Sequence, residues 1–196
     1  HTLDRVEYMF EPPMLYGLFS VIDRMDPTLW RFLYSNYLFE DFLMDALAGR
    51  RMNLNKYDDS SIYKVKLEAD IANRIESQYR RADLFAQTLG RRIAYKAPDI
   101  LPFLERLQVY YPQSPAIIMF REPEAVVASI RTKGWFAPHM RLSKVLQGPW
   151  RSLNPDVPFW VPVHITDQWL NASEIERCYI YYLRQYQSLE VLARQR

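Results

Sequence analysis

The stretch "AIIMFREPEAVVASI", residues 116–130, carries the clearest signal for the fold of this chain. The continuously apolar run from Ala116 to Phe120 predicts a parallel strand that is covered on both faces. Arg121 closes that run, and Pro123 is well placed to begin a helix that contains Ser129. The order of strand, charged residue, proline and helix therefore predicts one strand–helix step of an α/β fold.

The same order occurs twice more in the chain. The run "RVEYMF", residues 5–10, stops at Glu11 and Pro12, and the run "RRIAYK", residues 91–96, stops at Ala97 and Pro98. Three such steps predict an α/β fold in which helices flank a parallel sheet, as in doubly wound proteins. We expect a helix-rich single domain over residues 1–196 that is incomplete at both ends.

Helix signals lie between and after these strands. Asp26 and Pro27 form a good helix start, and Ser173 with Glu176 has the spacing of a capping box. We expect helices over residues 26–48 and 69–89, after Asp99, from Pro123, and from Ser173 onward. The apolar stripe expected for the last helix consists of Ile175, Cys178, Tyr182, Leu183, Tyr186 and Leu189.

Composition narrows the class of protein. The 196 residues are 49% hydrophobic, which is enough for a sizeable core, and the net charge of +2 is too small to indicate a nucleic-acid partner. Cys178 is the single cysteine, so a disulfide framework is excluded, and a buried core position is expected for it. No run is long and apolar enough for a membrane span. We expect a cytoplasmic protein, with the Golgi lumen as the alternative.

Charged residues follow each predicted strand. In open α/β sheets, ligands bind beyond the carboxyl ends of the strands, and Glu11, Lys96 and Arg121 occupy those positions. Arg121 also lies just before a predicted helix start, where backbone amides favour an anion, and the hydroxyl of Ser129 can add a hydrogen bond. The residues thus predict a site for an anionic group, although each charge could also simply mark a strand's exit into solvent.

The region from Tyr95 to Phe136 resembles the sulfotransferases that use 3′-phosphoadenosine 5′-phosphosulfate (PAPS). Members of that family carry a Lys-x-Pro or Lys-x-His element, then a Phe/Tyr-Pro pair, then a strand that ends in Arg-Asp/Glu-Pro with a serine eight residues after the arginine. This chain carries these elements in the same order, as Lys96-Ala97-Pro98, Tyr111-Pro112, Arg121-Glu122-Pro123 and Ser129.

The resemblance implies the sulfotransferase fold, which is P-loop-like. It also implies transfer of a sulfuryl group from PAPS to a hydroxyl or amine of a small molecule or carbohydrate. It assigns Arg121 and Ser129 to the 3′-phosphate of PAPS and Lys96 to the transferring group. No metal is expected, and neither is a nucleic-acid partner. The resemblance leaves more than one candidate for the general base, because Pro98 occupies the position at which one branch of the family has histidine. Glu11 matches the base of other branches by its context, and His139 and His164 remain alternatives.

One element of the family is missing. Its glycine-rich 5′-phosphosulfate loop would precede "RVEYMF", so we expect that loop upstream of His1 and expect the segment alone to be inactive. The glycines of this chain are scattered and form no phosphate cradle. Two alternatives therefore stay open: a non-catalytic binding or scaffold module with the sulfotransferase fold, and a nucleotide-binding domain like that of a small-molecule kinase.

Overall fold

The computed structural model describes residues 5–137 and 156–194. The chain divides into two compact units, residues 1–15 with 26–97 and residues 16–25 with 98–196, and each unit is described by itself. Within the described residues the protein is helix-rich and mixed α/β, with a small two-stranded parallel sheet. The expectation of one sulfotransferase-like domain over residues 1–196 stays a prediction.

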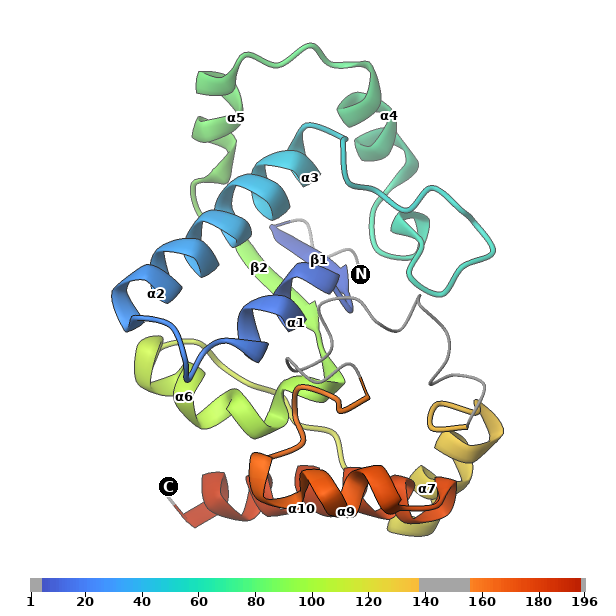
Figure 1. The fold of residues 1–196 in the computed structure, drawn as a ribbon. Helices are drawn as coiled ribbons and strands as arrows, with labels where there is room; N and C mark the ends of the chain where they lie inside the picture. Colours follow the sequence, from blue (N-terminus) through green and yellow to red (C-terminus); the bar gives the residue numbers. More distant parts are fainter. Residues whose placement is uncertain (1–4, 138–155, 195–196) are drawn as a thin grey trace. The chain divides into compact units, whose positions relative to one another are not determined.

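The first unit contains both strands. Its elements, coloured blue to light green in Figure 1, are β1 (Val6–Phe10), α2 (Pro27–Asn36), the π-helical η1 (Tyr37–Met44), α3 (Asp45–Leu47), η2 (Ile62–Lys64), α4 (Glu68–Glu76), α5 (Arg81–Thr88) and β2 (Arg92–Lys96). Helix α1 (Pro13–Ser20) crosses the division between the two units after Leu15.

Strands β1 and β2 pair in parallel, as the sequence predicts, with Val6 opposite Arg92 and Phe10 opposite Lys96. Side chains alternate between the two faces of a strand. One face meets the helical layer, because Tyr37 donates to the sulfur of Met9 at 3.6 Å and the hydroxyls of Tyr34 and Tyr95 lie 2.8 Å apart. On the same face Ile93 packs against a buried cluster of Leu43, Met44, Leu47 and Leu84.

The helix expected from Asp26 to about Ala48 is confirmed. The Asp26 carboxylate accepts hydrogen bonds from the backbone amides of Thr28 and Leu29, which caps α2. The helix continues through the π-helical η1, a widening that no sequence pattern predicted. It ends in a Schellman motif, since the amide of Gly49 bonds to Ala46 and the next amide bonds to Asp45.

The single helix expected over residues 69–89 is wrong, because the structure has α4 and α5 with an extended break between them. Both helices bury one apolar residue deeply, Ile71 in α4 and Leu84 in α5. On one straight helix these two residues would lie about 140° apart, given about 100° per residue. The break therefore allows each residue to reach buried surroundings.

The third expected strand, Ala116–Phe120, is also not formed. These residues are outside any helix or strand, and the side chains of Ile117 and Met119 are 95% and 83% exposed. A continuously apolar run becomes a central strand only where neighbouring strands supply hydrogen bonds. Among residues 5–137 and 156–194 the sheet contains β1 and β2 alone, and residues 116–120 pair with neither strand.

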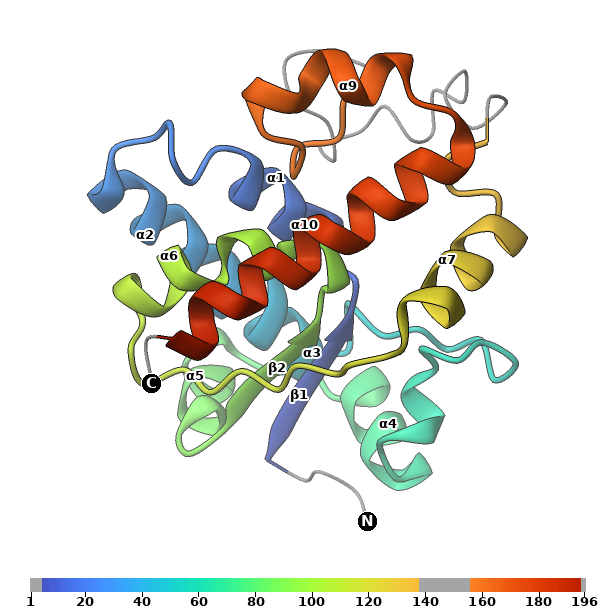
Figure 2. The same ribbon diagram turned by 90° about the horizontal axis from the view of Figure 1, so that it is seen from below.

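The second unit is built around a long helix. Its elements are η3 (Pro98–Phe103), α6 (Leu104–Tyr110), α7 (Pro123–Thr132), η5 (Val163–Ile165), α9 (Thr166–Asn171) and α10 (Glu174–Arg194). Figure 2 shows α7 beside α10. Trp160, Trp169 and Tyr181 are buried together with edge-to-face ring contacts, so these aromatic side chains form part of the core of the unit.

Helix α10 begins as expected but buries a different face. The capping box is present, because the amide of Ser173 donates to the Glu176 carboxylate at 2.7 Å. Cys178 is fully buried, as expected. The rest of the expected stripe is wrong in part, since Ile175, Leu183 and Tyr186 are exposed. The buried face is made instead by Arg177, Cys178, Tyr181, Ser188 and Leu192.

The hydrogen bonds of the Arg177 guanidinium explain part of the difference between the expected and the observed buried face of α10. It donates to the carbonyl oxygens of Trp169 and Leu170 at 3.0 Å each, and so caps the last turn of α9. A charged residue on the buried face is invisible to a hydrophobic pattern. None of the helices in the described ranges combines the length and the apolar character needed to cross a membrane.

Candidate functional site

Glu11 and Lys96 lie together at the carboxyl ends of β1 and β2, in the first unit. The strand register places Lys96 opposite Phe10, and the amide of Glu11 donates to the Lys96 carbonyl at 2.8 Å. The carboxylate of Glu11 then lies 3.6 Å from the ammonium of Lys96, with the two side chains 33% and 44% exposed. The structure thus brings together two of the four predicted site residues as an accessible acid–base pair.

The backbone of Glu11 is strained. Its φ is 46°, and it is the one non-glycine residue with positive φ among the described residues. Such a conformation is uncommon for a residue with a side chain, and it is found often at functional sites. It occurs here where the strand ends, before Pro12. The strain is an observation in favour of a role for Glu11 that sequence patterns could not provide.

Two aromatic side chains of β1, Phe10 and Tyr8, interact with this pair. The Lys96 ammonium lies over the ring of Phe10, 4.4 Å from the centroid. Burial raises the pKa of the Tyr8 phenol, and the negative charge of Glu11 raises it further. The negative charge of Glu11 therefore acts on the face of β1 that carries Tyr8 and Phe10. A regular strand would instead direct the side chain of residue 11 to the other face.

Arg121 and Ser129 lie in the second unit. Arg121 is exposed and precedes α7, which begins at Pro123 as predicted, while Ser129 is half-buried within the helix. Val127 and Ile130 form the buried face of α7. Within the described part of the chain, no hydrogen bond or ion pair joins Arg121 to Ser129. The structure therefore confirms the helix but does not bring these two side chains into contact.

The start of α7 leaves its first backbone amides without a side-chain cap. Its N-cap residue, Glu122, makes no side-chain hydrogen bond to the helix amides. Helix amides that no side chain caps, together with the helix dipole, favour a negative group. The side chains of Glu122 and Glu124 carry negative charge at the same end of the helix, so an incoming anion would depend on Arg121 for its counter-charge.

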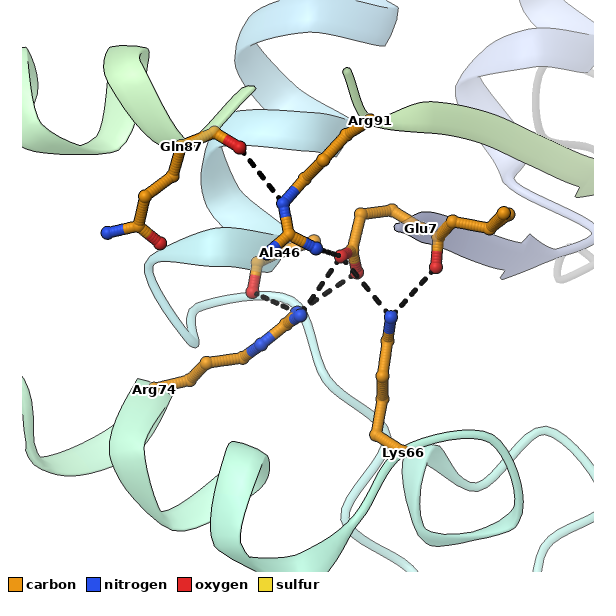
Figure 3. A network of polar contacts seen from close by, with 7 residues as sticks. Glu7, Ala46, Lys66, Arg74, Gln87 and Arg91 are labelled. Carbon is orange, nitrogen blue, oxygen red and sulfur yellow. Dashed lines mark hydrogen bonds and ion pairs between the residues drawn. The ribbon is translucent and has the colours of Figure 1, made fainter. Parts of the chain in front are cut away.

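A second charged cluster, which the sequence reasoning missed, surrounds Glu7 in β1. Figure 3 shows Arg74, Arg91 and Lys66 pointing toward the Glu7 carboxylate. Arg74 binds both carboxylate oxygens at 2.9 Å, Arg91 donates at 2.9 Å, and the Lys66 ammonium lies 3.4 Å away while donating to the Val6 carbonyl at 2.8 Å. Glu7 is only 2% exposed, so this is a buried ionic network.

Two opposing effects act on the Glu7 carboxyl. Burial raises its pKa, but the hydrogen bond from Arg74 and the charges of Arg74, Lys66 and Arg91 lower it more, so the net pKa lies below the usual value. Burial lowers the pKa of Lys66, and the charge of Glu7 opposes that effect. A glutamate at an inward position of an otherwise apolar strand was the signal that could have located this network in the sequence.

The remaining predicted residues contribute less. His139 lies outside the described residues, and so does much of the proline-rich stretch between Gly134 and Pro162. His164 is exposed in η5. Burial raises the pKa of the Cys178 thiol, and the charge of Glu174 adds to this effect, so the thiol has the properties of a core residue. In residues 5–137 and 156–194 no cluster of histidine, cysteine and acidic residues could hold a metal ion.

No protein-family model, curated protein or solved structure matches this chain. The fold and the site therefore define its class by themselves. The protein is a helix-rich mixed α/β protein whose two parallel strands end in a paired carboxylate and ammonium, Glu11 and Lys96.

Proposed function

We propose that this protein is a sulfotransferase that moves a sulfuryl group from PAPS to a hydroxyl or amine acceptor. The observation that carries the proposal is the Glu11–Lys96 pair, with 3.6 Å between carboxylate and ammonium, at the carboxyl ends of adjacent parallel strands. Ligands of open α/β sheets bind at such strand ends. A base and a cation held side by side are the two groups that sulfuryl transfer to a hydroxyl requires.

The chemistry assigns one task to each group. As the acceptor oxygen forms its bond to sulfur, the bond between sulfur and the bridging oxygen of the phosphosulfate breaks, and the Glu11 carboxylate takes the proton of the acceptor. The Lys96 ammonium stabilises the negative charge that grows on the departing phosphate. The strained backbone of Glu11 supports its assignment as the base, because strain of this kind often accompanies catalytic geometry.

Arg121 and the start of α7 are the proposed contacts for the 3′-phosphate of PAPS. A guanidinium can hold a phosphate through two parallel hydrogen bonds, and the N-terminus of α7 has no side-chain cap to compete with it. Ser129 lies six residues after Pro123, about 9 Å along the helix. The proposed contact of the Ser129 hydroxyl therefore lies more than one helical turn from the amides at the start of α7.

The proposal implies a larger parallel sheet flanked by helices, of which the β1–β2 pair is one part. It also implies a small-molecule or carbohydrate acceptor and a cytoplasmic location, with the Golgi lumen as the alternative.

The binding part is tested by calorimetry of the full-length protein with 3′,5′-adenosine bisphosphate. Arg121→Ala should weaken binding by roughly 1.5–3 kcal/mol, the scale of a charged hydrogen bond. Arg131→Ala is the matched control, because it removes the same charge from the last turn of the same helix and should change binding little. Equal binding by wild type and Arg121→Ala would show that Arg121 does not hold the 3′-phosphate.

The transfer part is tested with labelled PAPS and a panel of hydroxyl and amine acceptors. Glu11→Gln should lower kcat by about 100-fold or more, the contribution of a general base, with cofactor binding intact. Glu76→Gln, an exposed carboxylate on α4 in the same unit, should leave kcat unchanged. Binding without any transfer would instead support the scaffold alternative, and phosphoryl transfer from a nucleoside triphosphate would support the kinase-like one.

A further inference from the structure

The ring of Phe10 has an unusual environment for a strand residue. It is 41% exposed and stacks on no other aromatic side chain in the described part of the chain. Its contact is with the Lys96 ammonium, 4.4 Å from the ring centroid. An exposed aromatic ring that faces a cation is better explained by that cation than by core packing.

The ion pair with Glu11 does not by itself fix the position of Lys96. Both side chains are substantially exposed and their charged atoms lie 3.6 Å apart, and ion pairs of this kind hold flexible side chains weakly. A lysine has a long chain of rotatable bonds and loses much freedom when it is held in place. A second contact is needed to keep the ammonium in one position, and the ring of Phe10 supplies it.

The strained backbone explains how two consecutive residues reach the same ammonium. Neighbouring residues of a strand direct their side chains to opposite faces, so a regular strand would separate Phe10 from the side chain of Glu11. The φ of 46° at Glu11 breaks this alternation. The carboxylate of Glu11 consequently reaches Lys96 on the face that carries Phe10, where it also acts on Tyr8.

We infer that Phe10 is a positioning residue: its ring and the left-handed backbone of Glu11 together hold the Lys96 ammonium beside the Glu11 carboxylate. The consequence for turnover rests on the proposed function, because Phe10 acts through Lys96 and touches no reacting atom. Loss of the ring would leave the lysine mobile and so reduce stabilisation of the leaving phosphate, while contacts to the 3′-phosphate would stay intact.

The geometric part is tested by NMR of the full-length protein after ¹³C-methylation of its lysines, with Lys96 assigned through Lys96→Arg. A ring below the ammonium should shift the Lys96 methyl signal upfield of that of Lys64, whose contact is the Asp59 carboxylate. Phe10→Leu should abolish this upfield shift, and Phe10→Trp should retain or enlarge it. Phe32→Leu, at another exposed phenylalanine in the same unit, is the control and should leave the signal in place.

The kinetic part uses the same variants with PAPS and an acceptor. Phe10→Leu should lower kcat by about three- to tenfold, the rate change that corresponds to the loss of one cation–π contact, with KM for PAPS changed less than about twofold, and Phe10→Trp should restore kcat. A Lys96 signal that is the same in wild type and Phe10→Leu overturns the inference, and so does an unchanged kcat in Phe10→Leu. Absence of transfer by wild type would refute the proposed function alone, because the NMR result still decides the role of Phe10.

Discussion

Glu7 shows how one residue can organise a strand. Its buried carboxylate accepts hydrogen bonds from Arg74 in α4 and from Arg91 just before β2, and it therefore ties β1 to two other segments of the first unit. Because a slip of one residue would direct Glu7 to the opposite face, these ion pairs also favour the register that places Phe10 opposite Lys96.

Glu7→Gln should lower the free energy of unfolding by about 3–5 kcal/mol, because it leaves buried cations without their counter-charge. Urea unfolding followed by circular dichroism measures the change. Asp59→Asn is the control, since its ion pair with Lys64 has a fully exposed carboxylate and should contribute little. A loss in Glu7→Gln no larger than that in Asp59→Asn would show that the buried network does not stabilise the protein.

The contribution of Glu7 should also depend on pH. Its pKa in the folded protein is lower than the ordinary value of 4.5, so the unfolded chain takes up a proton at this group at a higher pH than the folded protein does. The stabilisation is therefore complete above pH 4.5 and is lost as the pH falls through the folded-state pKa. The difference in unfolding free energy between wild type and Glu7→Gln should be constant from pH 5 to 7 and should shrink toward pH 3; a difference that grows in acid would contradict this account.

At the scale of an element, the cost of replacing a glycine that ends a helix depends on its surroundings as well as on its backbone conformation. Gly49 and Gly90 both have positive φ, 72° and 73°. A Cβ at Gly49 would lie 2.5 Å from the backbone oxygen of Arg74, whereas a Cβ at Gly90 would meet only a side-chain atom of Arg5 at 3.6 Å. Only the first position combines conformational strain with a collision against backbone.

Gly90→Ala should cost about 1–2 kcal/mol, the penalty of a left-handed conformation for a residue with a side chain. Gly49→Ala should cost about 1–3 kcal/mol more, because the Arg74 backbone must move. Each variant adds one methyl group at nearly the same φ, so the difference between their urea unfolding free energies isolates the cost of the collision. Equal losses of unfolding free energy in the two variants would mean that the backbone around Arg74 moves aside at no cost in free energy.

At the scale of the whole molecule, the buried thiol of Cys178 can report on the unfolding of the second unit. Cys178, fully buried in the second unit, is the single cysteine of the chain and so reports on that unit alone. Its thiol should react with a disulfide reagent more than about 100-fold more slowly in the native protein than in urea, because reaction requires opening of the structure.

Gly49→Ala, in the first unit, should speed this labelling in proportion to its loss of unfolding free energy if the chain unfolds as the single domain that the sequence predicts. The continuity of α1 across the division favours such coupling. Gly90→Ala, in the same unit, should speed labelling less. Labelling that is unaffected by Gly49→Ala would show that the units unfold independently.

The sequence by itself determined the features that depend on neighbours along the chain. The Asp26 cap, the stop at Gly49, the start of α7 at Pro123, the capping box of α10 and the strands β1 and β2 were all predictable, because caps, turns and apolar periodicity act over a few residues. The position of Glu11 and of Lys96, each at the carboxyl end of its own strand, followed from the same local order.

Only the tertiary structure decided which of these segments pair as strands and which side chains form contacts between distant segments. The run Ala116–Phe120 has the sequence of a buried strand, yet it pairs with no strand in the described residues. Arg74 and Arg91 come from segments far from Glu7 in the chain, and Glu11 reaches the face of Phe10 and Lys96 through a backbone conformation that its residue type disfavours. Local patterns record propensity and periodicity, whereas buried ion pairs and strained turns depend on contacts between distant segments, which no local pattern contains.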